Sequence, residues 1–176
     1  MVFDIDHFKE VNDTYGHQFG DAALQTFSNI LAETVREQDL AARLGGEEFA
    51  VIFPDASLAT ALLIAERVRT KFAAHKFLNK GKSFSCSVSV GISQIGAPVA
   101  LTDLMVQADA ALYVAKRSGR NRVIQFSNRE DVRRQKNGEA RIMKENAEPI
   151  REALYPAVTV TARTQSQHKD RLTRRA

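Results

Sequence analysis

Apolar residues recur every three or four positions in three stretches of the chain, at residues 21–35, 58–72 and 102–119, a spacing that predicts amphipathic helices. Each stretch has one apolar face, so we expect the three helices to pack against a common layer. The apolar positions that define them are, in chain order, Leu24, Phe27, Ile30, Leu31 and Val35; Leu58, Ala61, Leu62, Ala65, Val68 and Phe72; and Leu104, Ala108, Leu112 and Ala115.

Residues with capping side chains stand where these helices would begin and end. Asp55 or Ser57 precedes the second stretch, Thr102 opens the third, and Asp21 can cap the first. Their side-chain oxygens can accept hydrogen bonds from the free N–H groups of a first helical turn. Gly119 suits the end of the third helix, because glycine readily adopts the left-handed conformation found there.

Shorter apolar segments predict strands. Residues 1–6 have the pattern of the end of a buried strand, whose beginning we expect further upstream, and residues 122–126 that of a closing strand. In residues 40–53, two apolar runs flank the pair Gly45-Gly46. This arrangement predicts a β-hairpin turning at the two glycines, because the favoured two-residue turns need or tolerate positive φ at their central positions.

Residues 83–90 alternate serine with apolar residues after a turn signal at 79–81, which predicts a half-buried strand with Cys86 on its apolar face. The complete order is strand, helices, hairpin, helix, hairpin, helix and strand. That order predicts an α+β layer, with one central sheet and helices packed on it. We expect a domain at residues 1–127 and an appendage at residues 128–176.

Composition agrees with this division. The 176 residues are 44% apolar, which is enough for a normal core, and no run of about 18 apolar residues encodes a membrane span. Residues 1–126 hold 13 Lys and Arg against 14 Asp and Glu, whereas residues 127–176 hold 12 against 7. The basic appendage has only Tyr155 as an aromatic residue, so we interpret it as solvated rather than as a nucleic-acid surface. Within it we expect a helix ended by Pro156 and then disorder at 165–176, the helix having an apolar stripe of Met143, Ala147, Ile150 and Leu154.

Four acids fall at two places that the predicted sheet can bring together. Strand alternation points Asp4 and Asp6 to one side, and Glu47 and Glu48 follow the glycine pair of the hairpin. Like charges in a small site raise one another's pKa, and a divalent cation would remove that repulsion. Mg²⁺ fits, because it prefers carboxylate, carbonyl, water and phosphate oxygens. The alternatives are ordinary strand-end acids and a solvated hairpin tip.

Polar residues elsewhere have the chemistry to hold a nucleotide. Backbone N–H groups after the first strand, together with Lys9, would suit a phosphate. Asn12 and Asp21 have the donors and acceptors to read a guanine edge, with turn and cap chemistry as the alternative. Lys116 and Arg120 could reach a triphosphate, although cations are favoured at a helix C-terminus in any case.

With these motifs in this order, residues 1–126 resemble a GGDEF domain, the catalytic module of diguanylate cyclases. The resemblance implies a fold like the palm of nucleotide cyclases and polymerases, with a ferredoxin-like central sheet. It also implies a nucleotidyltransferase that condenses two GTP molecules into cyclic di-GMP and releases pyrophosphate. The motifs that carry it are Asp4-Ile5-Asp6-His7-Phe8-Lys9, Asn12-Asp13, Gly16-His17 to Gly20-Asp21, Gly45-Gly46-Glu47-Glu48-Phe49, and Ala111-Leu112-Tyr113 through Gly119-Arg120-Asn121.

The resemblance further implies roles for single residues. Asp4 and Glu48 would ligate Mg²⁺, or Mn²⁺ in its place, with help from the Ile5 carbonyl. Glu47 would lie nearest the attacking ribose 3′-hydroxyl as metal ligand or base. Each domain would hold one GTP, so a homodimer is expected for catalysis. The residues implied to bind substrate are Asn12 and Asp21 at guanine, Phe8, Lys9, Lys116 and Arg120 at the phosphates, and Gly45 and Gly46 in the hairpin.

Arg36-Glu37-Gln38-Asp39 matches the inhibitory product site of the family, with Arg67 of a neighbouring surface as its partner, whereas an i to i+3 surface pair is the alternative. Family members usually continue upstream into the rest of the first strand and a sensory or dimerising domain. We expect a cytoplasmic protein or the cytoplasmic part of a membrane-associated one. Two other functions stay open: a catalytically silent receptor for cyclic di-GMP or GTP, and a dimerisation piece that uses the tail helix.

Overall fold

The structure, a computed structural model, describes residues 1–79, 82–94 and 100–126 and is built around one mixed sheet. The strand order is β2-β3-β1-β6-β7, so the strand that opens the chain lies in the middle. β6 and β7 are parallel, while the other neighbouring strands of this sheet are antiparallel. This arrangement confirms the predicted α+β layer. The strands are β1 (Val2–Ile5), β2 (Leu40–Gly45), β3 (Glu48–Ile52), β6 (Val88–Ile92) and β7 (Val123–Gln125).

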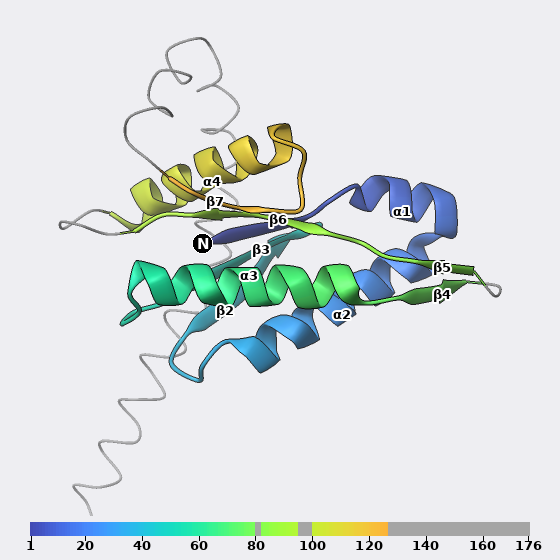
Figure 1. The fold of residues 1–176 in the computed structure, drawn as a ribbon, viewed down its shortest axis with the longest axis horizontal. Coiled ribbons are helices and arrows are strands. Elements are labelled where there is room, and N and C mark those ends of the chain that lie inside the picture. The colour runs from blue at the N-terminus through green and yellow to red at the C-terminus, as the bar shows by residue number, and fades with distance from the viewer. Residues whose placement is uncertain (80–81, 95–99, 127–176) are drawn as a thin grey trace, which may run out of the picture.

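Helices cover both faces of the sheet (Figure 1). α4 (Leu101–Arg117) lies on one face, and α2 (His17–Thr34) and α3 (Leu58–Ala74) lie on the other. On the α2 and α3 side, the rings of Phe3 and Phe27 pack edge to face with centroids 5.6 Å apart. These contacts bury the apolar helix faces that the three- and four-residue spacing predicts.

Because side chains alternate along a strand, the residues of β1 divide between the two faces. Phe3 and Ile5 belong to the core under α2 and α3, whereas Val2 packs with Leu112 of α4. Asp4 therefore shares the α4 face with Val2. The α4 side of the sheet is apolar at the start of β1 and acidic at its end.

Helix starts differ from the predicted ones at two places. α2 begins at His17, directly after Gly16 with φ 91°, so Asp21 lies inside the helix and does not cap it. Ala100 rather than Thr102 is the N-cap of α4. Ser57 does cap α3, since its Oγ accepts from the Thr60 N–H at 3.1 Å. The sequence did not reveal this start, because α1 (Phe8–Tyr15) ends directly before Gly16 and one residue is all that separates the two helices.

The β2–β3 hairpin forms as predicted, but its turn is shifted by one residue. Gly45 pairs with Glu48, which leaves Gly46 and Glu47 as the two turn residues. Gly46 has φ 48°, a left-handed value that glycine adopts without a steric penalty. The shift follows a bulge between Arg43 and Gly45, and the Arg43 Nε donates to the Gly46 carbonyl at 2.9 Å. Glu47 is therefore held in the turn itself.

The predicted strand at residues 83–90 is two strands in different sheets. β5 (Lys82–Phe84) pairs with β4 (Phe77–Asn79) in a separate hairpin beside α1, whereas β6 enters the central sheet (Figure 1). Ser89 is fully buried, although alternation placed it on a solvent face. It is buried because α4 covers that side of the sheet. Cys86 is buried as predicted.

Other predictions concern residues outside the described ranges. They are the glycine of the turn at 79–81, the tail helix with Met143, Ala147, Ile150, Leu154 and Pro156, and the disorder at 165–176. Within the described ranges, none of the helices has the length and hydropathy that a membrane crossing requires.

Candidate active site

Asp4 and Glu48 are direct partners across the antiparallel pair of β1 and β3. Next to them, the Ile5 N–H donates to the Glu47 carbonyl at 3.3 Å, so the hairpin turn is tied to the end of β1. Asp4 is only 5% exposed, and Glu47 and Glu48 are half-buried. The acids of the opening strand and of the hairpin, which lie over 40 residues apart in the chain, thus meet at one edge of the α4 face.

Lys116 brings a positive charge to these acids from the last turn of α4. Its Nζ lies 2.6 Å from Asp4 Oδ2, and its side chain is 35% exposed while that of Asp4 is 8% exposed. A charge-assisted hydrogen bond of this length is strong where water is largely excluded. Lys116 was predicted to meet phosphate, and the structure places it where Asp4 and solvent are both within reach.

The environment holds two of the acids away from their ordinary titration range. Burial raises the pKa of Asp4 to about 6, the hydrogen bond and charge of Lys116 act in the opposite direction, and Glu47 and Glu48 raise it further. The pKa of Glu48 is also raised, first by burial and then by Glu47, with Lys116 again opposing. Crowded carboxylates that repel one another are stabilised by an added cation.

The donor chemistry fits a divalent ion such as Mg²⁺. Within residues 1–79, 82–94 and 100–126, no cluster of three or more His, Cys, Asp and Glu encloses a metal position by itself. The adjacent carboxylates of Asp4 and Glu48 give two hard oxygen donors, and Mg²⁺ commonly takes its remaining ligands from water and substrate phosphates. Glu47 and the Ile5 carbonyl are the nearby groups that could extend the set.

Asp6 has a different environment from Asp4. Its Oδ1 accepts from the Ser89 hydroxyl at 2.7 Å, and its Oδ2 accepts from the Ser87 hydroxyl at 2.6 Å and from the Asn121 N–H at 3.1 Å. The two serines and Asn121 were not identified from the sequence as partners. The serine alternation offered a signal, but only the antiparallel register of β1 and β6 shows that these hydroxyls meet Asp6.

Of the two predicted guanine-reading residues, Asn12 lies against Gly20 where α1 packs on α2. A Cβ placed on Gly20 would lie 2.0 Å from Asn12 Oδ1 and 3.2 Å from the Phe8 ring, so glycine is what lets these side chains reach α2. Asp21, the next residue, is exposed on the same helix. Lys9 is also exposed, and Phe8 is half-buried at the start of α1.

Two further residues belong to the surroundings of the acids. Arg120, a predicted phosphate ligand, is exposed in the loop after α4 and has φ 60°. Asp109 was missed by the sequence analysis, although it lies seven residues before Lys116 and so on the same helical face. Burial and then the charge of Glu48 raise the pKa of Asp109 to about 7, while the Met1 amino group and Lys116 oppose the rise.

The predicted product-binding residues form a local unit after α2. Asp39, whose side chain is fully buried, accepts from the Arg36 backbone N–H at 2.8 Å and from the Arg36 guanidinium at 3.1 and 3.3 Å. The i to i+3 pair therefore exists. The Arg36 side chain nevertheless stays 42% exposed, so part of it is accessible to solvent. Arg67 is exposed on α3.

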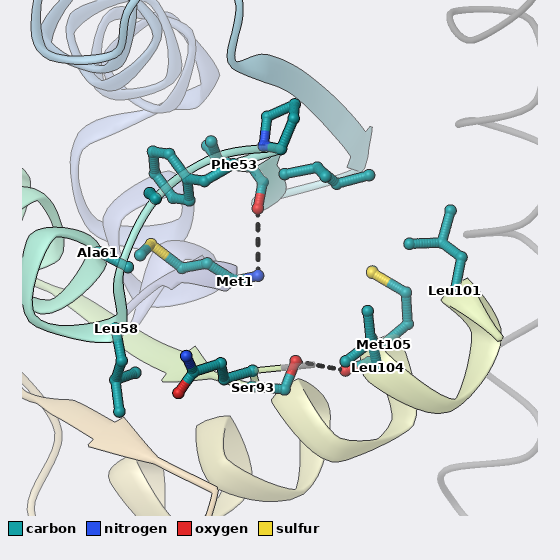
Figure 2. A pocket seen from close by; sticks show the side chains of 13 residues that line it. Met1, Phe53, Leu58, Ala61, Ser93, Leu101, Leu104 and Met105 are labelled. Atoms are coloured by element: carbon teal, nitrogen blue, oxygen red, sulfur yellow. Dashed lines mark hydrogen bonds between the residues drawn. The ribbon is translucent and has the colours of Figure 1, made fainter. Parts of the chain in front are cut away.

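A cavity of about 200 Å³ lies near the opposite end of β1 (Figure 2). It is bordered by the Met1 end of β1, where the Met1 N donates to the Val51 carbonyl at 3.1 Å, and by the first turns of α3 and α4. Its lining contains no acid, so it is separate from the site at Asp4 and Glu48. The lining residues include Phe53, Leu58, Ala61, Ser93, Leu101, Leu104 and Met105.

Comparison with known proteins identifies the family of this chain. The sequence model of the family described as "Diguanylate cyclase, GGDEF domain" matches residues 1–122. Diguanylate cyclase A of Treponema denticola is 40% identical over 124 residues, which are 70% of this chain and 33% of that protein. The response regulator PleD of Caulobacter vibrioides is 42% identical over 127 residues, which are 70% of this chain and 28% of that protein. The chain thus spans about a third or less of the length of these two relatives.

Solved structures give the same result for the fold. The GGDEF domain of DgcB from Caulobacter crescentus, solved in complex with c-di-GMP, superposes with a TM-score of 0.68 at 36% identity, covering 70% of this chain and 74% of that one. The active GGEEF domain of a diguanylate cyclase from Vibrio cholerae superposes with a TM-score of 0.67 at 32% identity, covering 72% and 81%. The matched sequence, the shared fold and the paired acids of β1 and the hairpin lead to one conclusion: the chain belongs to the GGDEF domain family.

Proposed function

We propose that this chain is the catalytic part of a diguanylate cyclase that condenses two GTP molecules into cyclic di-GMP. The observation that carries the proposal is the direct pairing of Asp4 with Glu48, two crowded acids of raised pKa beside Lys116. The fold does not need carboxylates that repel one another, whereas phosphoryl transfer with a divalent ion requires them. The named cyclases among the relatives support the same reaction.

The bond changes follow from the product. The ribose 3′-oxygen of each GTP attacks the α-phosphorus of the other, so a new P–O bond forms as the bond to the bridging oxygen breaks and pyrophosphate leaves. The 3′-hydroxyl proton passes to Glu47, or to water held by it. Bound at Asp4, Glu48 and the Ile5 carbonyl, Mg²⁺ or Mn²⁺ would supply the charge that favours hydroxyl ionisation and offsets that of pyrophosphate.

The remaining residues bind and orient the substrate. Asn12 and Asp21 would read the guanine edge where α1 meets α2. Lys116 and Arg120 would hold the phosphates together with Phe8 and Lys9 at the start of α1, and Gly45 and Gly46 leave room for the nucleotide. A Cβ added at either hairpin glycine would meet no atom within 4 Å, so the chain itself leaves this side of the hairpin open. The domain would span residues 1–127, with residues 128–176 as an appendage.

One domain binds one GTP, so two copies must bring their sites face to face, and we propose that a homodimer performs the reaction. An upstream sensory domain would control that dimer. Arg36 and Asp39, with Arg67 of a neighbouring copy, would bind cyclic di-GMP and inhibit the enzyme. The partly exposed side chain of Arg36 supports this proposal, because a guanidinium can bond a guanine edge or stack on a base. The proposed use of GTP supports a protein in the cytoplasm, or the cytoplasmic part of a membrane-associated one.

The test is an assay of the purified chain with GTP and Mg²⁺, in which cyclic dinucleotide and pyrophosphate are both measured. Cyclic di-GMP from the wild type but not from Glu48→Ala would support the cyclase. Binding of cyclic di-GMP without turnover, also in a sample held as a dimer by a fused coiled coil, would instead show a receptor. The fused dimer excludes the trivial explanation that the sites never met.

A further inference from the structure

Asp6 links three elements that are far apart in the sequence. It follows β1, its carboxylate accepts from Ser87 and Ser89 at β6, and it also accepts from the backbone of Asn121 in the loop between α4 and β7. Asp6 is 4% exposed, and Ser89 is fully buried. An apolar side chain would pack the same space without the cost of burying a charge, so a carboxylate here indicates a requirement for its acceptors.

The loop that Asp6 holds has an unusual backbone. Arg120 has φ 60° and Asn121 has φ 45°, two consecutive residues other than glycine in the left-handed region. Such conformations persist where the surroundings fix them, and they cluster at sites that bind ligands. The Arg120 N–H donates to the Ala115 carbonyl at 3.0 Å, and its carbonyl accepts from the Arg122 Nε at 2.9 Å. The backbone of Arg120 is therefore fixed while its side chain stays exposed.

A second contact holds the same loop from the other side. Arg69 of α3 donates from Nη1 to the Asn121 Oδ1 at 2.8 Å, and more weakly to the Asn121 carbonyl at 3.4 Å. Asn121 is thus bound through its N–H to Asp6 and through its side chain to Arg69. The end of β1 holds both ends of the segment that carries Arg120, because Asp4 binds Lys116 and Asp6 binds Asn121.

We propose that Asp6 is a positioning residue, which fixes the loop of residues 118–122 so that Arg120 meets the triphosphate of the bound nucleotide. The inference rests on the proposed function, since that function supplies the triphosphate. Asp6 itself touches neither nucleotide nor metal in this role. It acts through the N–H of Asn121, and the serine hydroxyls keep its carboxylate oriented.

The test combines hydrogen exchange of the loop with binding of Mg²⁺ and inorganic tripolyphosphate, measured by calorimetry. Asp6→Asn replaces one acceptor oxygen by a donor, and Ser89→Ala removes one hydroxyl while keeping the Asp6 charge. Both variants should speed amide exchange in residues 118–122 and weaken tripolyphosphate binding, Asp6→Asn by about 10-fold. Ser85→Ala, an exposed serine of the same run, should change neither. If Asp6→Asn does not fold, the loop exchange and tripolyphosphate affinity of Ser89→Ala decide the test.

A double-mutant cycle separates positioning from a general structural effect. In an Arg120→Ala background, Asp6→Asn should cause no further loss of tripolyphosphate affinity, because the residue it positions is gone. A loss that persists undiminished there would overturn the proposal, as would unchanged loop exchange or a wild type that does not bind tripolyphosphate. A wild type that binds tripolyphosphate with these dependences, yet makes no cyclic dinucleotide from GTP even in the fused dimer, would refute the proposed cyclase and leave the positioning role standing.

Discussion

Asp4 and Glu48 are register partners on adjacent strands, so their carboxylates project from the same face of the sheet toward α4. The pairing joins the opening strand to the central hairpin at the point where both become acidic. Lys116, from the end of α4, offsets part of this negative charge, with its Nζ 2.6 Å from Asp4 Oδ2. The predictions below follow from this group and from the contacts around it.

Asp4→Asn should abolish most of the cyclase activity, with a fall of at least about 100-fold, because it removes a carboxylate that would bind the divalent ion. The measurement is the rate of pyrophosphate release from GTP. Asp55→Asn, which makes the same change at an exposed acid outside the site, is the matched control. Equal activity in Asp4→Asn and Asp55→Asn would contradict the assignment.

The response to Mg²⁺ should depend on pH through Asp4. Its pKa is raised from 3.8 to about 6 in the folded protein, so between these values the folded state holds a proton that the unfolded state has released. Stability from this group alone therefore falls as pH rises through that window. Mg²⁺ needs the ionised carboxylate, so it should raise the melting temperature more at pH 7.5 than at pH 5.5. The same Mg²⁺ effect at both pH values would refute the linkage.

Lys116→Met should weaken nucleotide binding and raise the pKa of Asp4. The hydrogen bond and charge of Lys116 lower the pKa of Asp4, so the variant should move the acid limb of the pH profile upward. The KM for GTP should rise by about 10-fold, the loss typical of one charged contact. Lys71→Met, on the exposed side of α3, should leave both quantities unchanged.

Gly20→Ala should harm substrate recognition more than folding. The added methyl would lie 2.0 Å from Asn12 Oδ1, the end of a side chain that can move away, so the fold should lose only about 1 kcal/mol. Displacing Asn12 should raise the KM for GTP. In an Asn12→Ala background the glycine substitution should have little further effect, whereas independent effects would show that Asn12 is not the group displaced.

Arg36→Ala should relieve the proposed product inhibition without unfolding the segment after α2. The Arg36 backbone N–H still donates to Asp39, but the buried Asp39 carboxylate loses its guanidinium donors, so the stability loss should be about 1 to 3 kcal/mol. Asp39→Ala should cost a similar amount, because it leaves that N–H without its partner. Inhibition curves with added cyclic di-GMP provide the measurement. Unchanged inhibition in Arg36→Ala would place the product elsewhere.

The sequence determined the three amphipathic helices, the β-hairpin and the α+β layering, because local periodicity reports which face of an element is buried. It also determined the motifs at Asp4, Asn12 and Glu48 that identify the family. Its errors fell where neighbours override local preference. The serine run at 83–90 divides between two sheets, and Asp21 lies within a helix that starts earlier, at His17.

Only the tertiary structure decided which acids meet. The register of β1 against β3 pairs Asp4 with Glu48, while the register against β6 places Asp6 among the serine hydroxyls, so two acids with the same local pattern have different environments. The burial that raises the pKa of Asp4 and of Asp109 arises from α4 packing on the sheet. Strand pairing and desolvation depend on residues distant in the chain, so no local pattern in the sequence specifies them.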